Sequence, residues 1–146
     1  MRLSIKIIAV AFAALATVAA AEQKASDPTV IARQGVMDEV VKHGKVLFGM
    51  AGGDVAFDAA AAEAAKAGLI AASAKVNAAF KTEASDPASA AKPEIWTNWA
   101  DFEVKSKALS DAAGAADVTT LASVQAAAGA LGEACKGCHS VYRIKK

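Results

Sequence analysis

The sequence predicts an all-α fold, an antiparallel up-down-up-down bundle of four helices. Three observations support this prediction. Alanine, the residue with the highest helix propensity, recurs along most of the chain. Larger apolar residues recur at three- and four-residue steps in four separate segments, and no segment alternates apolar and polar residues as a strand would. The segments are joined by short connections, which favour antiparallel neighbours in a bundle.

The first 21 residues have the pattern of an export segment. Two basic residues near the start precede an apolar run, and residues 18–21 supply small side chains before a cleavage point at Glu22. The alternative is an uncleaved anchor, although the run is short and alanine-rich for a membrane span. We therefore expect a cleavable secretory signal peptide at 1–21 and one mature domain at 22–146.

The charge of the mature chain excludes two classes of partner. Without Arg2 and Lys6, 14 of the 16 basic residues remain against 15 acidic ones, a net charge of −1 with neutral histidines. A chain so balanced has no electrostatic attraction for nucleic acid or for an anionic membrane surface. We expect neither as a partner of the mature form.

The first two helices are predicted from caps and glycines. Ser26-Asp27-Pro28 has an N-cap residue followed by proline in the first turn, and the glycines at 49, 52 and 53 stop the segment. One stripe at three- and four-residue steps carries Val30, Arg33, Met37, Val40, Gly44 and Leu47. A second helix is expected over 58–80, with Leu69, Ile70, Val76 and Phe80 as its larger apolar residues, and a polar loop then runs to Pro93.

The third helix is expected to start at Glu94 and the fourth to cover 118–143. The stripe of the third is Trp96, Trp99, Phe102, Ser106 and Leu109. We expect its three aromatic residues to form core and pocket wall rather than electron relays. The stripe of the fourth is Leu121, Val124, Ala128, Leu131, Cys135, Cys138 and Tyr142. Both cysteines thus fall on the core-facing side of the last helix, inside the bundle.

The run Cys135-Lys136-Gly137-Cys138-His139 carries the chemistry of this chain. A C-x-x-C-H run is typical of c-type haem attachment, in which two sulfurs form thioethers with the haem vinyl groups and the histidine ligates the iron. Residues three apart on a helix share a face, so both sulfurs can reach one edge of a porphyrin. Haem is joined to reduced cysteines outside the bacterial cytoplasm, so the export segment and the motif together predict a periplasmic protein with one haem c.

Three other interpretations of the cysteines compete with haem attachment. A closed zinc site needs about four ligands, and the chain has two cysteines and two histidines, with His43 far from the motif. A thioredoxin-like redox pair belongs with a βαβ pattern, which is missing from this sequence. A disulfide would close a small, strained loop on a helix. The last two also leave His139 without a role.

The pattern resembles the class II c-type cytochromes, the cytochrome c′ family, over essentially the whole mature chain. The resemblance rests on the C-terminal position of the C-x-x-C-H run with Val141-Tyr142-Arg143 after it, on Lys92-Pro93-Glu94-Ile95-Trp96, and on Arg33-Gln34-Gly35-Val36-Met37. It implies a periplasmic four-helix haem protein that forms a homodimer through its first two helices.

The resemblance also assigns further site residues. Arg33 and Gln34 match a first-helix pair beside the haem propionates, where an arginine would have an anionic partner. Ser89 and Ala90 match a stretch that passes the same haem edge. Arg143 matches an arginine on the proximal side, near the imidazole of His139. The alternative for Arg143 is a solvated cation that favours the helix C-terminus.

Met37 lies one turn after Arg33, and the sequence leaves its role open. If its sulfur reaches the iron, the haem is six-coordinate, as in the low-spin branch of the family, and suited to electron transfer. If Met37 only packs over the porphyrin, the iron is five-coordinate with an apolar distal face that admits neutral gases. His43 lies six residues further on and off the stripe, so we do not expect it to be a ligand.

The predicted function is one-electron transfer, in which the iron cycles between Fe(II) and Fe(III). The alternative is a module that binds nitric oxide or carbon monoxide. We do not expect an enzyme, because the distal stripe offers no second titratable group as general acid or base. Redox proteins or small gases are the expected partners, and the lysines at 136, 145 and 146 form either a docking patch for an acidic redox protein or a solvated tail.

Overall fold

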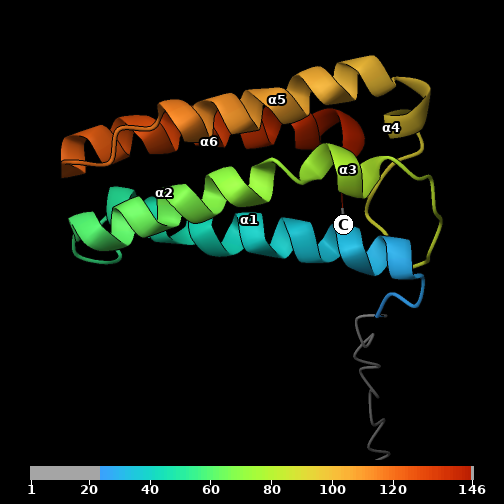
Figure 1. The fold of residues 1–146 in the computed structure, drawn as a ribbon, viewed down its shortest axis with the longest axis horizontal. Helices are drawn as coiled ribbons and strands as arrows, with labels where there is room; N and C mark the ends of the chain where they lie inside the picture. The colour runs from blue at the N-terminus through green and yellow to red at the C-terminus, as the bar shows by residue number, and fades with distance from the viewer. Residues whose placement is uncertain (1–23, 146) are drawn as a thin grey trace, which may run out of the picture.

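Four long helices form the predicted bundle in a computed structural model that describes residues 24–145. These are α1 (Pro28–Gly52), α2 (Ala59–Ser73), α5 (Trp99–Ala115) and α6 (Leu121–Tyr142), with two short helices, α3 (Val76–Phe80) and α4 (Glu94–Thr97), between α2 and α5. Each long helix packs against its neighbour in the chain, and α6 also packs against α1, which closes the bundle (Figure 1). The all-α prediction is confirmed, and the predicted signal peptide at 1–21 lies outside the described residues.

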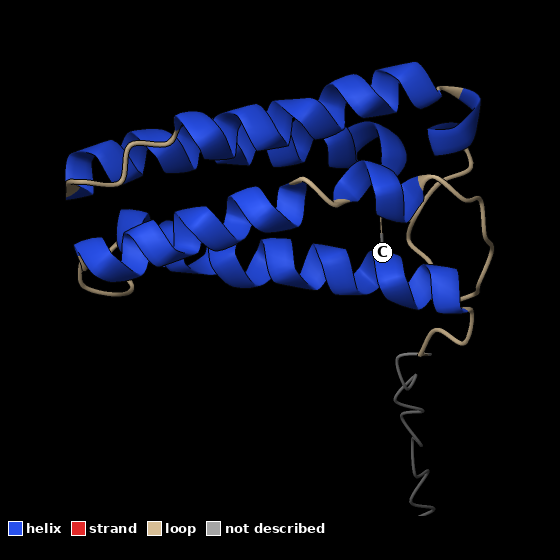
Figure 2. Cartoon of the chain, in the orientation of Figure 1, coloured by secondary structure: helices blue, strands red, loops and turns tan. Residues whose placement is uncertain are grey.

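The described part of the chain consists of helices joined by loops (Figure 2). Its single β-type pairing is an isolated antiparallel bridge between Ala91 and Arg143. None of the helices in residues 24–145 combines the length and the apolar character that a membrane crossing requires.

The predicted limits of α1 are confirmed, and local hydrogen bonds account for them. Asp27 is the N-cap: its Oδ1 accepts from the backbone N–H groups of Thr29 at 2.7 Å and Val30 at 3.1 Å. Gly53 ends the helix with a φ of 82°, a left-handed conformation that glycine adopts without steric cost. Met50 is a buried core residue of the last turn.

Two of the predicted helices are each divided in the structure. The segment 58–80 breaks after Ser73, whose hydroxyl donates to the carbonyl of Ile70 at 3.1 Å and competes with regular helical bonding. The segment from Glu94 breaks at Asn98, whose φ of −122° and ψ of 44° lie outside the helical region. The short helices α3 and α4 that result turn the chain over one end of the bundle (Figure 1).

The last helix begins three residues later than predicted, because a capping box fixes its start. The Thr120 hydroxyl accepts from the backbone of Ser123 at 3.1 Å, and the Ser123 hydroxyl accepts from the backbone of Thr120 at 3.0 Å. Leu121 is consequently 41% exposed, so its predicted place on the core stripe was wrong. Ile70 of α2 is likewise 40% exposed.

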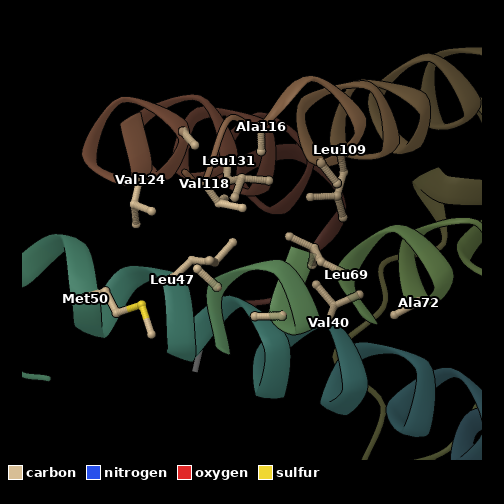
Figure 3. Close-up of a cluster of buried hydrophobic side chains, with 14 residues drawn as sticks. Val40, Leu47, Met50, Leu69, Ala72, Leu109, Ala116, Val118, Val124 and Leu131 are labelled. Carbon is tan, nitrogen blue, oxygen red and sulfur yellow. The ribbon is translucent and has the colours of Figure 1, made fainter. Parts of the chain in front are cut away.

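The core consists of two clusters, one in each half of the bundle. The first is aliphatic and joins all four long helices; Figure 3 shows Val40, Leu47, Met50, Leu69, Ala72, Leu109, Ala116, Val118, Val124 and Leu131. The second is mainly aromatic and contains Val76, Phe80, Ile95, Phe102 and Tyr142. Around Phe102 the rings of Phe80, Trp99 and Tyr142 lie 5.3, 5.3 and 5.5 Å away between centroids.

Asp86 fastens the loop before α4 to the start of α1. Its carboxylate accepts from the backbone N–H of Ser26 at 2.8 Å, of Asp27 at 3.0 Å and of Ala88 at 2.8 Å, and from the Ser26 hydroxyl at 3.1 Å. These backbone hydrogen bonds to Asp27, Ser26 and Ala88 lower the pKa of Asp86 to about 2, because they stabilise the ionised form.

We expect Asp86 to make the folding free energy pH-dependent in the acid range. Its pKa is lower in the folded state, so its contribution is present in full above the pKa of an unfolded aspartate and is lost as pH falls towards about 2. In urea unfolding, Asp86→Asn should therefore be less stable than the wild type at pH 6, and the difference should shrink at acid pH. Asp54→Asn, at the exposed far end of α1, is the control. A difference that is constant with pH would contradict this role.

Candidate haem-binding site

The cysteines and histidine of the C-x-x-C-H run lie on the last two turns of α6. Cys135, Cys138 and His139 are each half-buried, and both thiols are free. Among residues 24–145, no three His, Cys, Asp or Glu side chains gather closely enough to hold a metal ion. The zinc interpretation therefore finds no ligand set in this part of the chain.

One cavity of about 410 Å³ brings the predicted site residues together. All nine line it: Arg33, Gln34, Met37, Ser89, Ala90, Cys135, Cys138, His139 and Arg143. Helix α1 supplies the first three, and the loop before α4 supplies the next two. The end of α6 supplies Cys135, Cys138 and His139, and Arg143 directly follows that helix. Residues separated by up to 110 positions in the sequence thus face the same space.

The remaining wall of the cavity is mostly apolar and was only partly predicted. Val30, Val40, Leu69, Phe102, Leu109, Leu131 and Tyr142 belong to the expected stripes, whereas Val41, Phe48, Ile95 and Ala134 were not singled out. Ser106 lies on the expected α5 stripe and is buried. Asp38, Lys45 and Lys105 also border the cavity, at positions adjacent to the apolar stripes of α1 and α5.

Burial affects the protonation of all three motif side chains. It raises the pKa of both the Cys135 and the Cys138 thiol, because a thiolate is poorly solvated there. Burial, and secondarily the Arg143 cation, lower the pKa of His139. The imidazole is thereby kept neutral at physiological pH, and a neutral imidazole is the form that ligates a metal.

Arg33 is a buried cation that has no carboxylate partner within ion-pair distance among the described residues. Its side chain is 3% exposed. One terminal nitrogen donates to the Ala84 carbonyl at 3.3 Å and the other to that of Thr82, while Nε has no hydrogen-bond partner. Desolvation lowers the pKa of Arg33, and the charges of Asp27 and Glu83 oppose this. An anionic group in the cavity would satisfy both the charge and the orphaned Nε.

The loop before α4 is held from both sides of the cavity. On one side, Gln34 of α1 donates through Nε2 to the Ala88 carbonyl at 3.2 Å. On the other, the Ala90 carbonyl accepts from Ile144 at 2.8 Å, just beyond α6. The Ser89 hydroxyl accepts from the Ala91 backbone at 3.2 Å, so the loop uses it internally.

Tyr142 lines the cavity from the last turn of α6. It is 3% exposed, and its hydroxyl donates to Asp101 Oδ2 at 2.6 Å. Burial, reinforced by the Asp101 carboxylate, raises the pKa of Tyr142 to about 12. The phenol therefore stays neutral, and the hydrogen bond ties the end of α6 to the first turn of α5.

Two aromatic residues that were expected in the pocket wall do not line the cavity. Trp96 and Trp99 are half-buried and pack against the aromatic cluster. The break at Asn98 separates Trp96 from α5, whereas Trp99 is the first residue of α5 and stacks on Phe102. His43 was not expected to be a ligand, and it does not line the cavity either. The His43 ring packs against Gly68 of α2, and a Cβ atom added to Gly68 would clash with that ring.

The residues present fit a haem with two thioether attachments. The volume lies within the range of small-molecule and cofactor sites, and the wall is predominantly apolar, as the porphyrin face requires. The unpaired Arg33 cation offers a partner for a propionate, and the two thiols and the neutral imidazole lie on one side of the same space.

Comparison with known proteins agrees with this fit. The family model for cytochrome c′ matches residues 28–143. Cytochrome c′ of Alcaligenes xylosoxydans xylosoxydans is 36% identical over 120 residues, which cover 78% of this chain and 91% of that protein. Among solved structures, cytochrome c′ from Rhodobacter Spheriodes superposes with a TM-score of 0.76 at 30% identity, covering 81% of this chain and 96% of the other.

A second structural relative was solved with a gas bound. It is a nitric oxide complex of a mutant cytochrome c′ from Alcaligenes xylosoxidans, with a TM-score of 0.70 and 35% identity. The match covers 81% of this chain and 94% of that one.

Proposed function

Because this chain belongs to the cytochrome c′ family, whose cofactor is haem c, we propose that it transfers single electrons and that Cys135, Cys138 and His139 hold the haem. The observation that carries this proposal is the shared cavity, which unites the C-x-x-C-H run with all six other candidate residues. When bound, the haem supplies an iron that accepts or releases one electron and can bind a small neutral gas.

Each motif residue has a role that its surroundings support. The thiols of Cys135 and Cys138 lie one helical turn apart and point to one side of α6, so both can form thioethers with one porphyrin edge. His139 is held neutral by burial and by Arg143, and so its imidazole would be able to ligate the iron. Arg143 itself lines the cavity one turn further on, on the side of the imidazole.

The polar end of the cavity would receive the haem propionates. Arg33 brings a buried positive charge with an unused donor, and Gln34 fixes the backbone of the loop that carries Ser89 and Ala90. Hydrogen bonds to the Ala84 and Thr82 carbonyls hold the Arg33 charge, so it would need little rearrangement when the cofactor gains or loses an electron. Such preorganisation favours fast electron transfer.

The C-terminal end of α6 is a candidate docking surface for a redox protein. Residues 134–146 contain four lysines and arginines and no acidic residue. Within the described part, Lys136, Arg143 and Lys145 are exposed, and Val141 and Ile144 among them are 41% and 43% exposed. A cationic surface with an apolar centre suits an acidic partner. Slower electron exchange with an acidic protein in Lys136→Glu, but not in Lys66→Glu on α2, would support this assignment.

Gas binding is the second candidate function, and one comparison favours it. The relative from Alcaligenes xylosoxidans was solved as a nitric oxide complex. The α1 stripe that faces the cavity, Val30, Arg33, Met37, Val40 and Gly44, is apolar except for Arg33. Such a wall admits a neutral diatomic gas. Arginine stays protonated, so this stripe supplies no general acid or base, although Asp38 and Lys45 border the cavity beside it. We propose no enzymatic turnover.

Met37 decides between the two functions. It is half-buried, lines the cavity and packs against the aromatic cluster. If its sulfur ligates iron, Met37→Leu should convert a low-spin absorption spectrum into a high-spin one and lower the reduction potential, because thioether ligation stabilises Fe(II). Met50→Leu is the matched control, since Met50 is buried on the same helix in the aliphatic cluster and does not line the cavity. An unchanged spectrum in Met37→Leu would exclude ligation.

Carbon monoxide gives the complementary result. Electron transfer through six-coordinate iron predicts that the reduced wild type ignores carbon monoxide and that Met37→Leu binds it. The gas-binding function predicts that the reduced wild type already binds it. A reduced wild type that fails to bind carbon monoxide would therefore remove the second candidate function.

We also propose that the mature protein is periplasmic and forms a homodimer. The export pattern of residues 1–21 supports the first, and exposed apolar side chains on the first two helices support the second: Ile31 is 50% exposed and Ile70 is 40% exposed. A mature N-terminus at Glu22 and a dimer mass in sedimentation equilibrium are the expected results. An uncleaved chain or a monomer at high concentration would contradict them.

A further inference from the structure

The buried guanidinium of Arg33 is surrounded by a cage from three other elements. The Trp96 ring of α4 lies 4.8 Å from its Cζ atom, measured to the ring centroid, and the Phe80 ring of α3 lies 5.6 Å away. The carbonyls of Thr82 and Ala84 take the terminal nitrogens. Only Nε is left without a hydrogen-bond partner.

Trp96 contributes to this cage twice. Its ring face meets the guanidinium at a distance typical of a cation–π contact. Its indole Nε1 donates to the Phe80 carbonyl at 2.9 Å. This hydrogen bond fixes the backbone two residues before Thr82, whose carbonyl accepts from Arg33. One side chain thus supports Arg33 directly and also positions part of the backbone that binds it.

We propose that Trp96 is the positioning residue that keeps the Arg33 guanidinium at the cavity, and that through Arg33 it raises the reduction potential of the haem. This inference rests on the proposed function, in which Arg33 meets a propionate. A desolvated cation without a carboxylate partner gains by turning to water when its support is removed. Trp96 opposes that movement, although it does not line the cavity itself.

The sign of the effect follows from Coulomb's law. The oxidised haem carries one more positive charge than the reduced haem, so a nearby cation disfavours oxidation and raises the potential. A cation that moves out to solvent is screened and has less effect. The same cation stabilises an ionised propionate, so its departure should also raise the pH at which the propionate titrates.

The experiment compares the midpoint potential and its pH profile in a set of haem-loaded variants. Trp96→Leu removes the ring and the hydrogen bond, and should lower the midpoint potential. It should also move the propionate titration, seen as a step in the acid range of the potential–pH profile, to higher pH. Trp96→Phe keeps a ring face and should shift both readouts less, and it remains informative if the leucine variant folds poorly. Trp99→Leu is the matched control, because Trp99 is also half-buried and carries a cation, Lys81 Nζ, 5.0 Å from its ring centroid.

A double-mutant cycle with Arg33→Gln separates this inference from the proposed function. If Trp96 acts through Arg33, Trp96→Leu should cause no further shift in the Arg33→Gln background. A shift that persists there, an unchanged potential in Trp96→Leu, or an equal shift in Trp99→Leu would overturn the inference. If Arg33→Gln alone leaves the potential and the profile unchanged, the proposed role of Arg33 beside the propionate is wrong, and the inference falls with it.

Discussion

Replacement of His139 by alanine is expected to remove the protein ligand of the haem iron while the fold and the attachment to Cys135 and Cys138 are retained. His139 belongs to neither core cluster, and alanine is a better helix former, so the bundle loses little stability. At equal haem concentration, the absorption spectrum of the reduced variant should differ from that of the reduced wild type. Added imidazole should restore the wild-type spectrum. Half-saturation at about 1 mM would correspond to a binding free energy of about −4 kcal/mol.

The neighbouring residue provides the control for this variant. Ser140 is exposed on the same turn of α6, and its hydroxyl donates to the Gly137 carbonyl at 3.2 Å. Ser140→Ala should have the wild-type spectrum and no response to imidazole at the same concentration. A wild-type spectrum in His139→Ala would mean that another group is the axial ligand.

Phe102→Ala is expected to cause the largest loss of stability. The ring is 2% exposed, lines the cavity and is the centre of the aromatic cluster. Truncation of such a ring typically costs about 3–5 kcal/mol, because the lost contacts leave a cavity that the surroundings fill only in part. Since a domain has about 5–15 kcal/mol in total, much of its stability would be lost. Urea unfolding of the haem-loaded protein measures this difference.

Val104 on the same helix is the matched control for Phe102. Its side chain is 67% exposed, so Val104→Ala should change the free energy of unfolding by less than about 0.5 kcal/mol. Both changes raise helix propensity, so similar losses for Val104→Ala and Phe102→Ala would contradict the packing account.

The features predictable from the sequence are those with local causes. The start of α1 depends on the side chain of Asp27 and its end on Gly53, both within one turn of the boundary. The inward orientation of Cys135 and Cys138 follows from the three- and four-residue spacing along α6, which any regular helix preserves. The convergence of nine site residues on one cavity was predicted from the family resemblance as well as from these patterns.

The features that the sequence did not reveal depend on contacts between elements. The break at Asn98 separates Trp96 from the α5 stripe. Periodicity alone extended that stripe one turn too far towards the N-terminus, to include Trp96. The packing of Trp96 on Arg33 joins α4 to α1, and residues 63 positions apart carry no pattern that predicts such a contact. The position of Met50 at the end of α1 did not reveal its burial in the aliphatic cluster, which depends on contacts with other helices.

The central claim is that one haem is covalently bound to Cys135 and Cys138 of the processed chain. The most direct test is the intact mass of the purified protein after extraction with acidified acetone. We predict the mass of residues 22–146 plus one haem, with the pigment remaining on the protein. A mass equal to that of the polypeptide alone, with the pigment in the solvent, would contradict the claim.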